Sequence, residues 1–175
     1  MKTNDRLLAV DASAKDWREG VPEFSIRDVM LMRLIRVASL GITALTDPVL
    51  RPTGLTESSY HTLIVVLASG AAGTTPSVLC EQLGQNRANM TRIIDLLKSE
   101  KLIRIGRDTR DARRRHIVIT PSGSTLVRTY AKRFQPILRT VFGTLAESDK
   151  RALNCMLRNL IGAMDAAERL VQRAV

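Results

Sequence analysis

The chain has 175 residues, 45% of them hydrophobic, which is enough to bury a core and fits one domain or one compact subunit of an oligomer. It carries 27 Lys and Arg against 17 Asp and Glu, a net charge of +10 that favours a polyanionic partner, with nucleic acid first and an anionic membrane second. Aromatic residues make up 3% of the chain, which disfavours proteins that stack single-stranded bases on aromatic platforms.

Several classes of site lack a sequence signal. No uninterrupted apolar run reaches the roughly 18 residues of a membrane span, and residues 1–11 lack a signal-peptide core, so we expect a cytoplasmic protein with no membrane partner. Cys80 and Cys155 lie far apart without Cys-x-x-Cys or His spacing, which predicts inert core thiols, no disulfide scaffold and no metal site. No nucleophile–base pair, paired carboxylates or phosphate-cradling loop stands at usable spacing, so we expect no catalytic residues and no cofactor.

The N-terminal part divides into an arm and a helix. Residues 1–22 show no sustained periodicity and are expected to form a flexible arm. From Phe24 to Leu45 apolar residues recur at helical spacing, until Asp47-Pro48 and Arg51-Pro52 break the pattern. Residues 23–54 are therefore predicted to be a long helix and a loop.

Cap signals place the next three helices. Thr56 is the expected N-cap of a second helix, and Thr75-Pro76 opens a short third helix that Gly84 ends. Asn86 caps a fourth helix over residues 87–99. Two helices joined by a glycine-containing turn predict a helix-turn-helix.

A β-hairpin follows the helix-turn-helix. Ile103 and Ile105 alternate with polar residues, as do Ile117 and Ile119 with their neighbours, which predicts two strands around a polar tip. Residues 104–115 hold six Arg against two Asp. Such a hairpin can straddle a phosphate backbone.

Two long helices close the chain. Thr120-Pro121 starts one helix, with a possible kink at Pro136, and a second begins near Glu147 with a heptad-like apolar stripe. The fold class is therefore mainly α: a winged helix-turn-helix over residues 55–120, with a three-helix core and a β-hairpin wing, plus dimerisation helices over 23–54 and 121–175. An obligate homodimer is expected, because the monomer offers nothing that fully covers the long stripes.

Four motifs in residues 55–123 resemble the MarR family of transcriptional regulators, and within it the multidrug-efflux repressors. They are Leu55-Thr56 followed by Tyr60, the recognition-helix string from Asn86 to Leu97, the strand from Leu102 to Ile105, and Asp111-Ala112-Arg113 followed by Ile119-Thr120-x-x-Gly123. Asp108-Thr109-Arg110 offers a second Asp-x-Arg, but the distance to Thr120 favours Asp111 and Arg113.

The resemblance implies a double-stranded DNA operator as partner. In the recognition helix, Arg87 and Asn89 are expected at base edges, and Thr91 and Arg92 at phosphates or a thymine methyl group. In the wing, Arg113 is expected to enter the minor groove with Asp111 orienting it. The same basic tip contributes Arg107, Arg110 and Arg114.

The resemblance also implies release from DNA by a small aromatic acid. Arg33 and Arg36 interrupt an apolar helix and could hold a carboxylate, with Met30, Tyr60 and His61 as walls of the pocket. The alternatives are solvent-facing arginines, a core Tyr60 and a surface His61. Two other functions remain open: redox sensing through Cys80 or Cys155, and architectural DNA binding without sequence preference.

Overall fold

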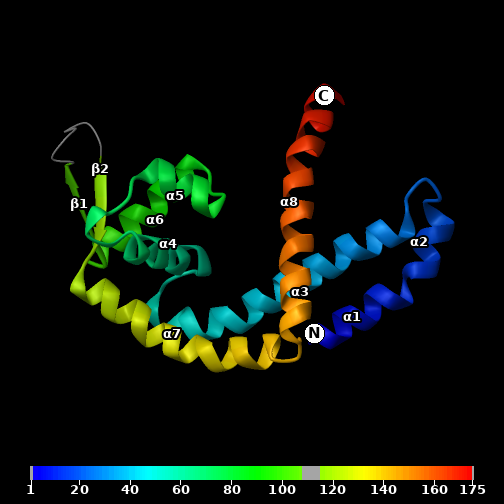
Figure 1. The fold of residues 1–175 in the computed structure, drawn as a ribbon, viewed down its shortest axis with the longest axis horizontal. Coiled ribbons are helices and arrows are strands. Elements are labelled where there is room, and N and C mark those ends of the chain that lie inside the picture. The colour runs from blue at the N-terminus through cyan, green and yellow to red at the C-terminus, as the bar shows by residue number, and fades with distance from the viewer. Residues whose placement is uncertain (1, 108–114, 175) are drawn as a thin grey trace. The chain divides into compact units, whose positions relative to one another are not determined.

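The structure is a computed structural model that describes the backbone of residues 2–107 and 115–174 (Figure 1). Contacts divide the chain into two compact units, one up to Lys132 and one from Arg133 onward. The first unit contains these elements: α1 (Thr3–Ala12), α2 (Ala14–Gly20), α3 (Ile26–Leu50), η1 (Arg51–Thr53), α4 (Glu57–Ala68), η2 (Gly70–Ala72), α5 (Pro76–Leu83), α6 (Arg87–Ser99), β1 (Ile103–Arg107), β2 (Arg115–Ile119) and the start of α7 (Pro121–Phe142). The second unit contains the end of α7 and all of α8 (Glu147–Ala174).

The predicted caps are confirmed at the three central helices. The side chains of Thr56, Thr75 and Asn86 each accept a hydrogen bond from the backbone N–H three residues later. Gly84 ends α5 in the left-handed conformation, with φ 59° and ψ 31°. This backbone turn, which glycine adopts without a steric penalty, sets the direction in which α6 leaves α5.

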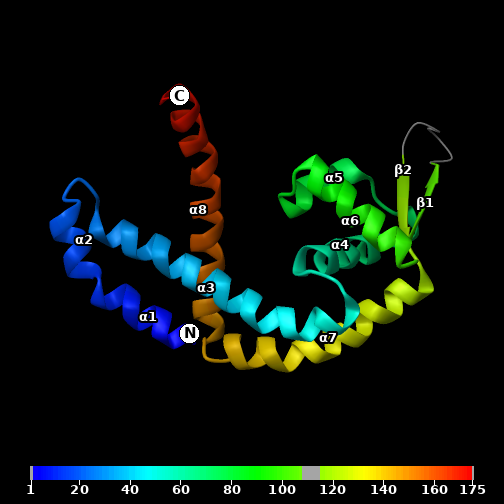
Figure 2. The same ribbon diagram turned by 180° about the vertical axis from the view of Figure 1, so that it is seen from behind.

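The N-terminal residues differ from the expected flexible arm. They form α1 and α2, which lie against α3 in both views (Figures 1 and 2). The contact depends on a few individual residues. Val10 is buried, and the Arg33 guanidinium donates a hydrogen bond to Ser13 Oγ at 2.5 Å. A helix that buries a single large side chain shows almost no hydrophobic periodicity, so the pattern did not reveal it.

Helix α3 is longer than predicted. It continues through Pro48 to Leu50, and the 3-10 turn η1 follows at once. Pro48 stands in the last turn, where the hydrogen bond that it cannot donate affects only the final residues of the helix. By length and composition alone, the segment Ile26–Thr53 could cross a membrane. Its apolar run is not continuous, because Arg33 and Arg36 divide the apolar residues.

The core of the winged helix comes from α4, α5, α6 and the hairpin. Its fully buried side chains include Leu63, Leu79, Met90, Leu97 and Ile117. The strands pair antiparallel in the register Ile103 with Ile119 and Ile105 with Ile117. One face of each element therefore meets in a single core, as the alternation predicted.

The hairpin is fastened to the helix-turn-helix by backbone contacts. Thr74, directly before the α5 cap, exchanges two hydrogen bonds with Ile117: Thr74 N–H donates to Ile117 O at 2.9 Å, and Ile117 N–H donates to Thr74 O at 2.8 Å. Gly73 lets the chain approach β2, since a Cβ there would stand 2.6 Å from Ile117 O and 2.7 Å from the His116 ring. The residue before the α5 cap and strand β2 are therefore held together by their backbones.

A second set of contacts holds the base of the wing. Thr120 Oγ1 donates toward the carbonyls of Lys101 and Leu102 at 2.8 and 3.0 Å and accepts from Gly123 N–H at 3.1 Å. Lys101 adopts a left-handed φ of 58° where α6 turns into β1. At Gly123 a Cβ would lie 2.2 Å from Leu102 O. The Thr-x-x-Gly motif therefore packs the first turn of α7 against the backbone that leads into β1.

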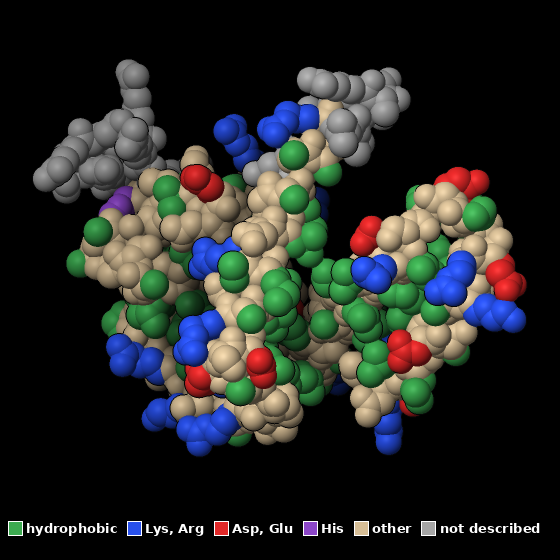
Figure 3. Space-filling model, turned by 45° about the vertical axis from the view of Figure 1, so that its right-hand side comes forward, with side chains coloured by type: hydrophobic (Ala, Val, Ile, Leu, Met, Phe, Trp, Pro, Cys, Tyr) green, Lys and Arg blue, Asp and Glu red, His purple; other side chains and the backbone are tan. Residues whose placement is uncertain are grey.

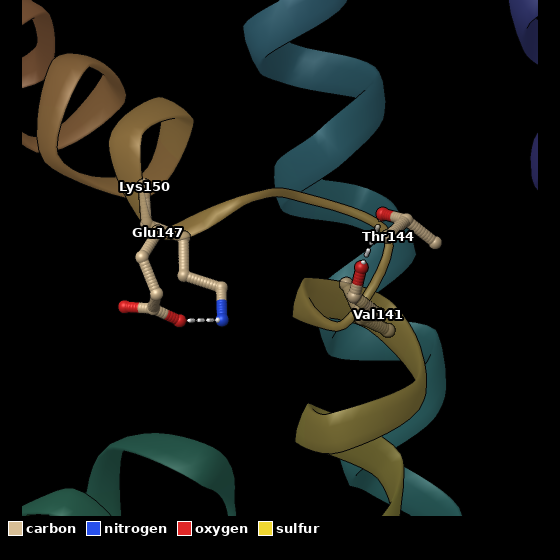
Figure 4. A network of polar contacts seen from close by, with 4 residues as sticks. All are labelled: Val141, Thr144, Glu147 and Lys150. Carbon is tan, nitrogen blue, oxygen red and sulfur yellow. Dashed lines mark hydrogen bonds and ion pairs between the residues drawn. The ribbon is translucent and has the colours of Figure 1, made fainter.

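In the second unit, local polar contacts form the turn between α7 and α8 (Figure 4). Thr144 Oγ1 donates to Val141 O at 2.9 Å, and Lys150 Nζ lies 2.6 Å from Glu147 Oε1 in the first turn of α8. Large apolar side chains remain exposed along α8. They are Leu153, Met156, Leu157, Leu160, Ile161 and Met164.

We expect Gly123→Ala to lower the free energy of unfolding by about 1–3 kcal/mol, because the added methyl group meets a backbone carbonyl that cannot move freely. Gly106→Ala is the matched control, since a Cβ there has nothing within 4 Å. Urea unfolding followed by circular dichroism measures both. Equal losses in the two variants would show that the contact at Gly123 is not responsible.

Candidate nucleic-acid interface

Helix α6 presents a polar face opposite its buried one. Met90, Ile93, Ile94 and Leu97 are buried, whereas Arg87, Thr91 and Arg92 are exposed. Within the described residues neither Arg87 nor Arg92 makes an ion pair. The second helix of the helix-turn-helix therefore offers two uncompensated guanidinium groups in its early turns, where phosphates or base edges would lie.

Asn89 is held in place by a residue that the sequence reasoning missed. Its Nδ2 donates to Gln85 Oε1 at 2.6 Å, and its backbone N–H donates to Asn86 Oδ1 at 2.8 Å. Because Gln85 precedes the N-cap Asn86, it lies outside the helix whose periodicity guided the prediction. Thr91 donates its hydroxyl hydrogen to Arg87 O at 2.9 Å, so its oxygen remains an acceptor.

The structure brings the wing strands beside this helix but does not describe the wing tip. Arg104 is exposed on β1, and His116 lies over Gly73 at the start of β2. Of Arg107, only the backbone in β1 is described. Arg110, Asp111, Arg113 and Arg114 lie outside the described residues, so their roles stay predictions.

Comparison with known proteins identifies a family domain in the winged helix. Residues 53–114 match the model of the MarR family. The transcriptional repressor MprA of Escherichia coli is 24% identical over 147 residues, which covers 84% of this chain and 84% of that protein. The chain therefore contains a MarR family domain over residues 53–114. It is therefore a DNA-binding transcriptional regulator by family.

Solved structures support the MarR fold. The Staphylococcus aureus MepR–DNA complex superposes with a TM-score of 0.71 at 23% identity, covering 76% of this chain and 95% of that one. CouR from Rhodococcus jostii RHA1, bound to p-coumaroyl-CoA, gives a TM-score of 0.68 at 19% identity over 74% of this chain and 90% of that one. Both confirm the predicted mainly α winged helix.

Arg33 makes several contacts within the N-terminal region. Besides Ser13 Oγ, its guanidinium points to Val10 O at 3.4 Å and to Met30 Sδ at 3.9 Å, and it lies 5.4 Å from the centroid of the Trp17 ring. Arg36 is exposed one turn further on. Both arginines line a groove from which Met30, Tyr60 and His61 are absent.

Tyr60 lies in the core of the winged helix. Its hydroxyl donates to Val127 O at 3.1 Å, and its ring meets Tyr130 edge to face at a centroid distance of 6.4 Å. Burial raises the pKa of the Tyr60 phenol above its ordinary value of 10.0. The neighbouring His61 is exposed on α4. The structure therefore groups Tyr60 with α7, and not with the two arginines of α3.

Both cysteines are more accessible than predicted. Cys80 is half-buried and Cys155 is exposed, with Asn159 Nδ2 at 3.8 Å from its sulfur. Burial of Cys155 was expected because a second subunit was expected to cover the apolar stripe of α8. In a single chain, the part of α8 around Cys155 is exposed.

We expect Tyr60→Phe to lower the free energy of unfolding at pH 7 by about 0.5–1.5 kcal/mol, because the hydrogen bond to Val127 is lost. The folded-state pKa is raised, so the unfolded phenol ionises first, and this contribution to stability fades as the pH rises above the ordinary value of 10.0. The difference between wild type and Tyr60→Phe should therefore narrow there. Denaturant unfolding of both proteins at pH 7 and at a pH above 10.0 measures this difference in stability.

Tyr130→Phe serves as the control, because it keeps the Tyr60 phenol and should keep the alkaline decline. A gap between wild type and Tyr60→Phe that stays constant with pH would contradict the stated titration.

Proposed function

We propose that this MarR family protein is a homodimeric repressor that binds a pseudo-palindromic operator in duplex DNA and leaves it when a small aromatic carboxylate binds. The observation that carries the DNA part is the polar face of α6, in which exposed Arg87 and Arg92 flank an Asn89 amide already fixed by Gln85. The superposition with MepR, a protein solved with DNA, supports the same assignment.

The readout divides between helix and wing. An asparagine amide can bind adenine with one donor and one acceptor, and an arginine can bind guanine or a phosphate. We assign base edges to Asn89 and Arg87, and the backbone to Thr91 and Arg92. In the wing, we assign the minor groove to Arg113, oriented by Asp111, with Arg107, Arg110 and Arg114 strengthening the attraction to phosphates.

Two uncovered apolar surfaces support the homodimer. The stripe of α8 exposes six large apolar side chains, and α3 in the other unit exposes Leu31, Leu34, Ile35 and Ile42 among others. Patches of this kind mark interaction surfaces in proteins. Two-fold pairing would place two α6 helices at half-sites about 10 base pairs apart.

Two observations support a small aromatic carboxylate as the effector. CouR was solved with p-coumaroyl-CoA, an aromatic acyl ligand, and the present chain has arginines on α3 that can bind an acid group. A redox alternative rests on the exposure of Cys155, and an architectural alternative on the basic wing. Selection from random DNA separates sequence-specific from architectural binding, because an architectural protein would enrich no motif.

In that selection we expect wild type to enrich a palindromic motif, and Asn89→Ala to lose preference at one position per half-site by about fivefold or more, the value of a good bidentate base contact. Arg113→Ala should instead weaken binding to all sites and flatten the preference for narrow minor grooves. Arg18→Ala on α2 is the charge-matched control. The same change of motif in Asn89→Ala and Arg113→Ala would contradict this division of labour.

Sedimentation equilibrium tests the homodimer. Leu157→Glu places a charge on the α8 stripe and should shift the protein toward monomer, whereas Asn159→Glu adds the same charge off the stripe and should leave the dimer intact. A wild-type protein that sediments as a stable folded monomer would refute the homodimer.

A further inference from the structure

The turn between α5 and α6 consists of Gly84, Gln85 and Asn86. Its backbone is fixed at both ends. Gln85 N–H donates to Cys80 O of α5 at 3.0 Å, beside the left-handed Gly84 that this kind of helix end requires. Asn86 caps α6, because its side chain accepts from Asn89 N–H at 2.8 Å. The point from which the Gln85 side chain starts is therefore set by the contacts of the turn itself.

Asn89 is the third residue of α6, where a side chain has two possible uses. It can reach back to the N–H of the cap residue and complete a capping box. In this structure the Asn89 amide instead donates from Nδ2 to Gln85 Oε1 at 2.6 Å. Both side chains are half-buried, whereas Arg87 and Ala88 beside them are exposed. One hydrogen of the Asn89 amide is therefore committed to Gln85.

The direction of this hydrogen bond decides what the Asn89 amide can offer to a base. A primary amide has two N–H donors and one carbonyl acceptor. Because Gln85 accepts one hydrogen, one donor and the acceptor remain, and they match the N7 acceptor and the N6 amino donor of adenine in the major groove. If residue 85 donated to Asn89 Oδ1 instead, two donors would remain. These match the N7 and O6 acceptors of guanine.

The positive charges of the protein cannot make this distinction. Lys and Arg side chains are spread over several parts of the face shown in Figure 3, with Asp and Glu side chains among them. Contacts between such cations and phosphates strengthen binding to any duplex, whereas base identity is read by directional donors and acceptors. Of the two residues assigned to base edges, Arg87 carries donors only. Asn89 is therefore the one that can accept from an adenine amino group.

We propose that Gln85 is a positioning residue for base recognition, which holds the Asn89 amide in the sense that reads adenine. The proposal rests on the proposed function, in which Asn89 contacts a base edge, and it adds the base and the residue that determines it. Gln85 acts through Asn89 and needs no contact of its own with DNA. Its effect on the base preference therefore disappears when the Asn89 side chain is removed.

Two substitutions separate the two senses of the hydrogen bond. Gln85→Glu retains an acceptor without a donor, and Gln85→Lys retains a donor without an acceptor. In selection from random DNA, we expect wild type and Gln85→Glu to enrich adenine at the position that Asn89→Ala identifies. Gln85→Lys should shift this position toward guanine. Gln85→Ala should reduce the preference for adenine by about threefold or more, the value of one neutral hydrogen bond.

Gln82→Glu and Gln82→Lys are the matched controls for charge, because Gln82 is exposed on α5. They should alter the affinity for every site and leave the motif unchanged. In the Asn89→Ala background, neither Gln85→Ala nor Gln85→Lys should change the preference at this position any further. A guanine preference that persists without Asn89 would mean that the new lysine contacts the base directly, and it would overturn the proposal.

Three other results would overturn the positioning role of Gln85. They are a wild-type motif in Gln85→Ala, one and the same motif in Gln85→Glu and Gln85→Lys, and a base other than adenine at the position that depends on Asn89. Each of them leaves the proposed function standing, because the wild type would still select a motif. Wild-type protein that enriches no motif would refute both.

Discussion

Two backbone hydrogen bonds between Thr74 and Ile117 connect the parts of the winged helix that must act together. Thr74 precedes the cap of α5, and Ile117 is the fully buried centre of β2. Because both groups are backbone atoms in a desolvated place, losing either bond would leave a buried donor or acceptor unpaired. The start of α5 and strand β2 therefore keep a fixed spacing.

Part of the positive charge of the chain lies on the elements that these hydrogen bonds connect. A net charge of +10 attracts any polyanion, but α6 and the hairpin gather part of it on elements held in fixed register. Other arginines serve elsewhere: Arg33 fastens the N-terminal helices, and Arg36 lines the groove beside it. One residue type thus contributes both to attraction for DNA and to the structure of the N-terminal region.

The sequence was most informative where local chemistry decides the backbone. The boundaries of the central helices were predictable because each signal acts within one turn. The signals are the threonine and asparagine caps, Pro76 at a helix start and Gly84 at a helix end. The N-terminal helices escaped prediction because their stability comes from contacts made across sequence separations of 20 or more residues, such as Arg33 with Ser13. The surroundings of Tyr60 stayed open at the level of sequence for a related reason: its partners Val127 and Tyr130 lie far along the chain.

The exposed face of α6 was predictable, but the arrangement of its side chains was not. Spacing placed Arg87, Asn89 and Arg92 on an exposed face, yet could not show which side chains are restrained. The structure shows Asn89 bonded to Gln85 and Arg87 without an ion-pair partner in the described ranges.

The bond between Gln85 and Asn89 has an entropic consequence. An exposed asparagine samples several rotamers and loses that freedom when it docks on a base. Here Gln85 takes one hydrogen of the amide, while the other hydrogen and the carbonyl oxygen remain for a partner. In the proposed readout the ordering cost would therefore fall on folding rather than on association, and discrimination by Asn89 would depend on geometry set before the DNA arrives.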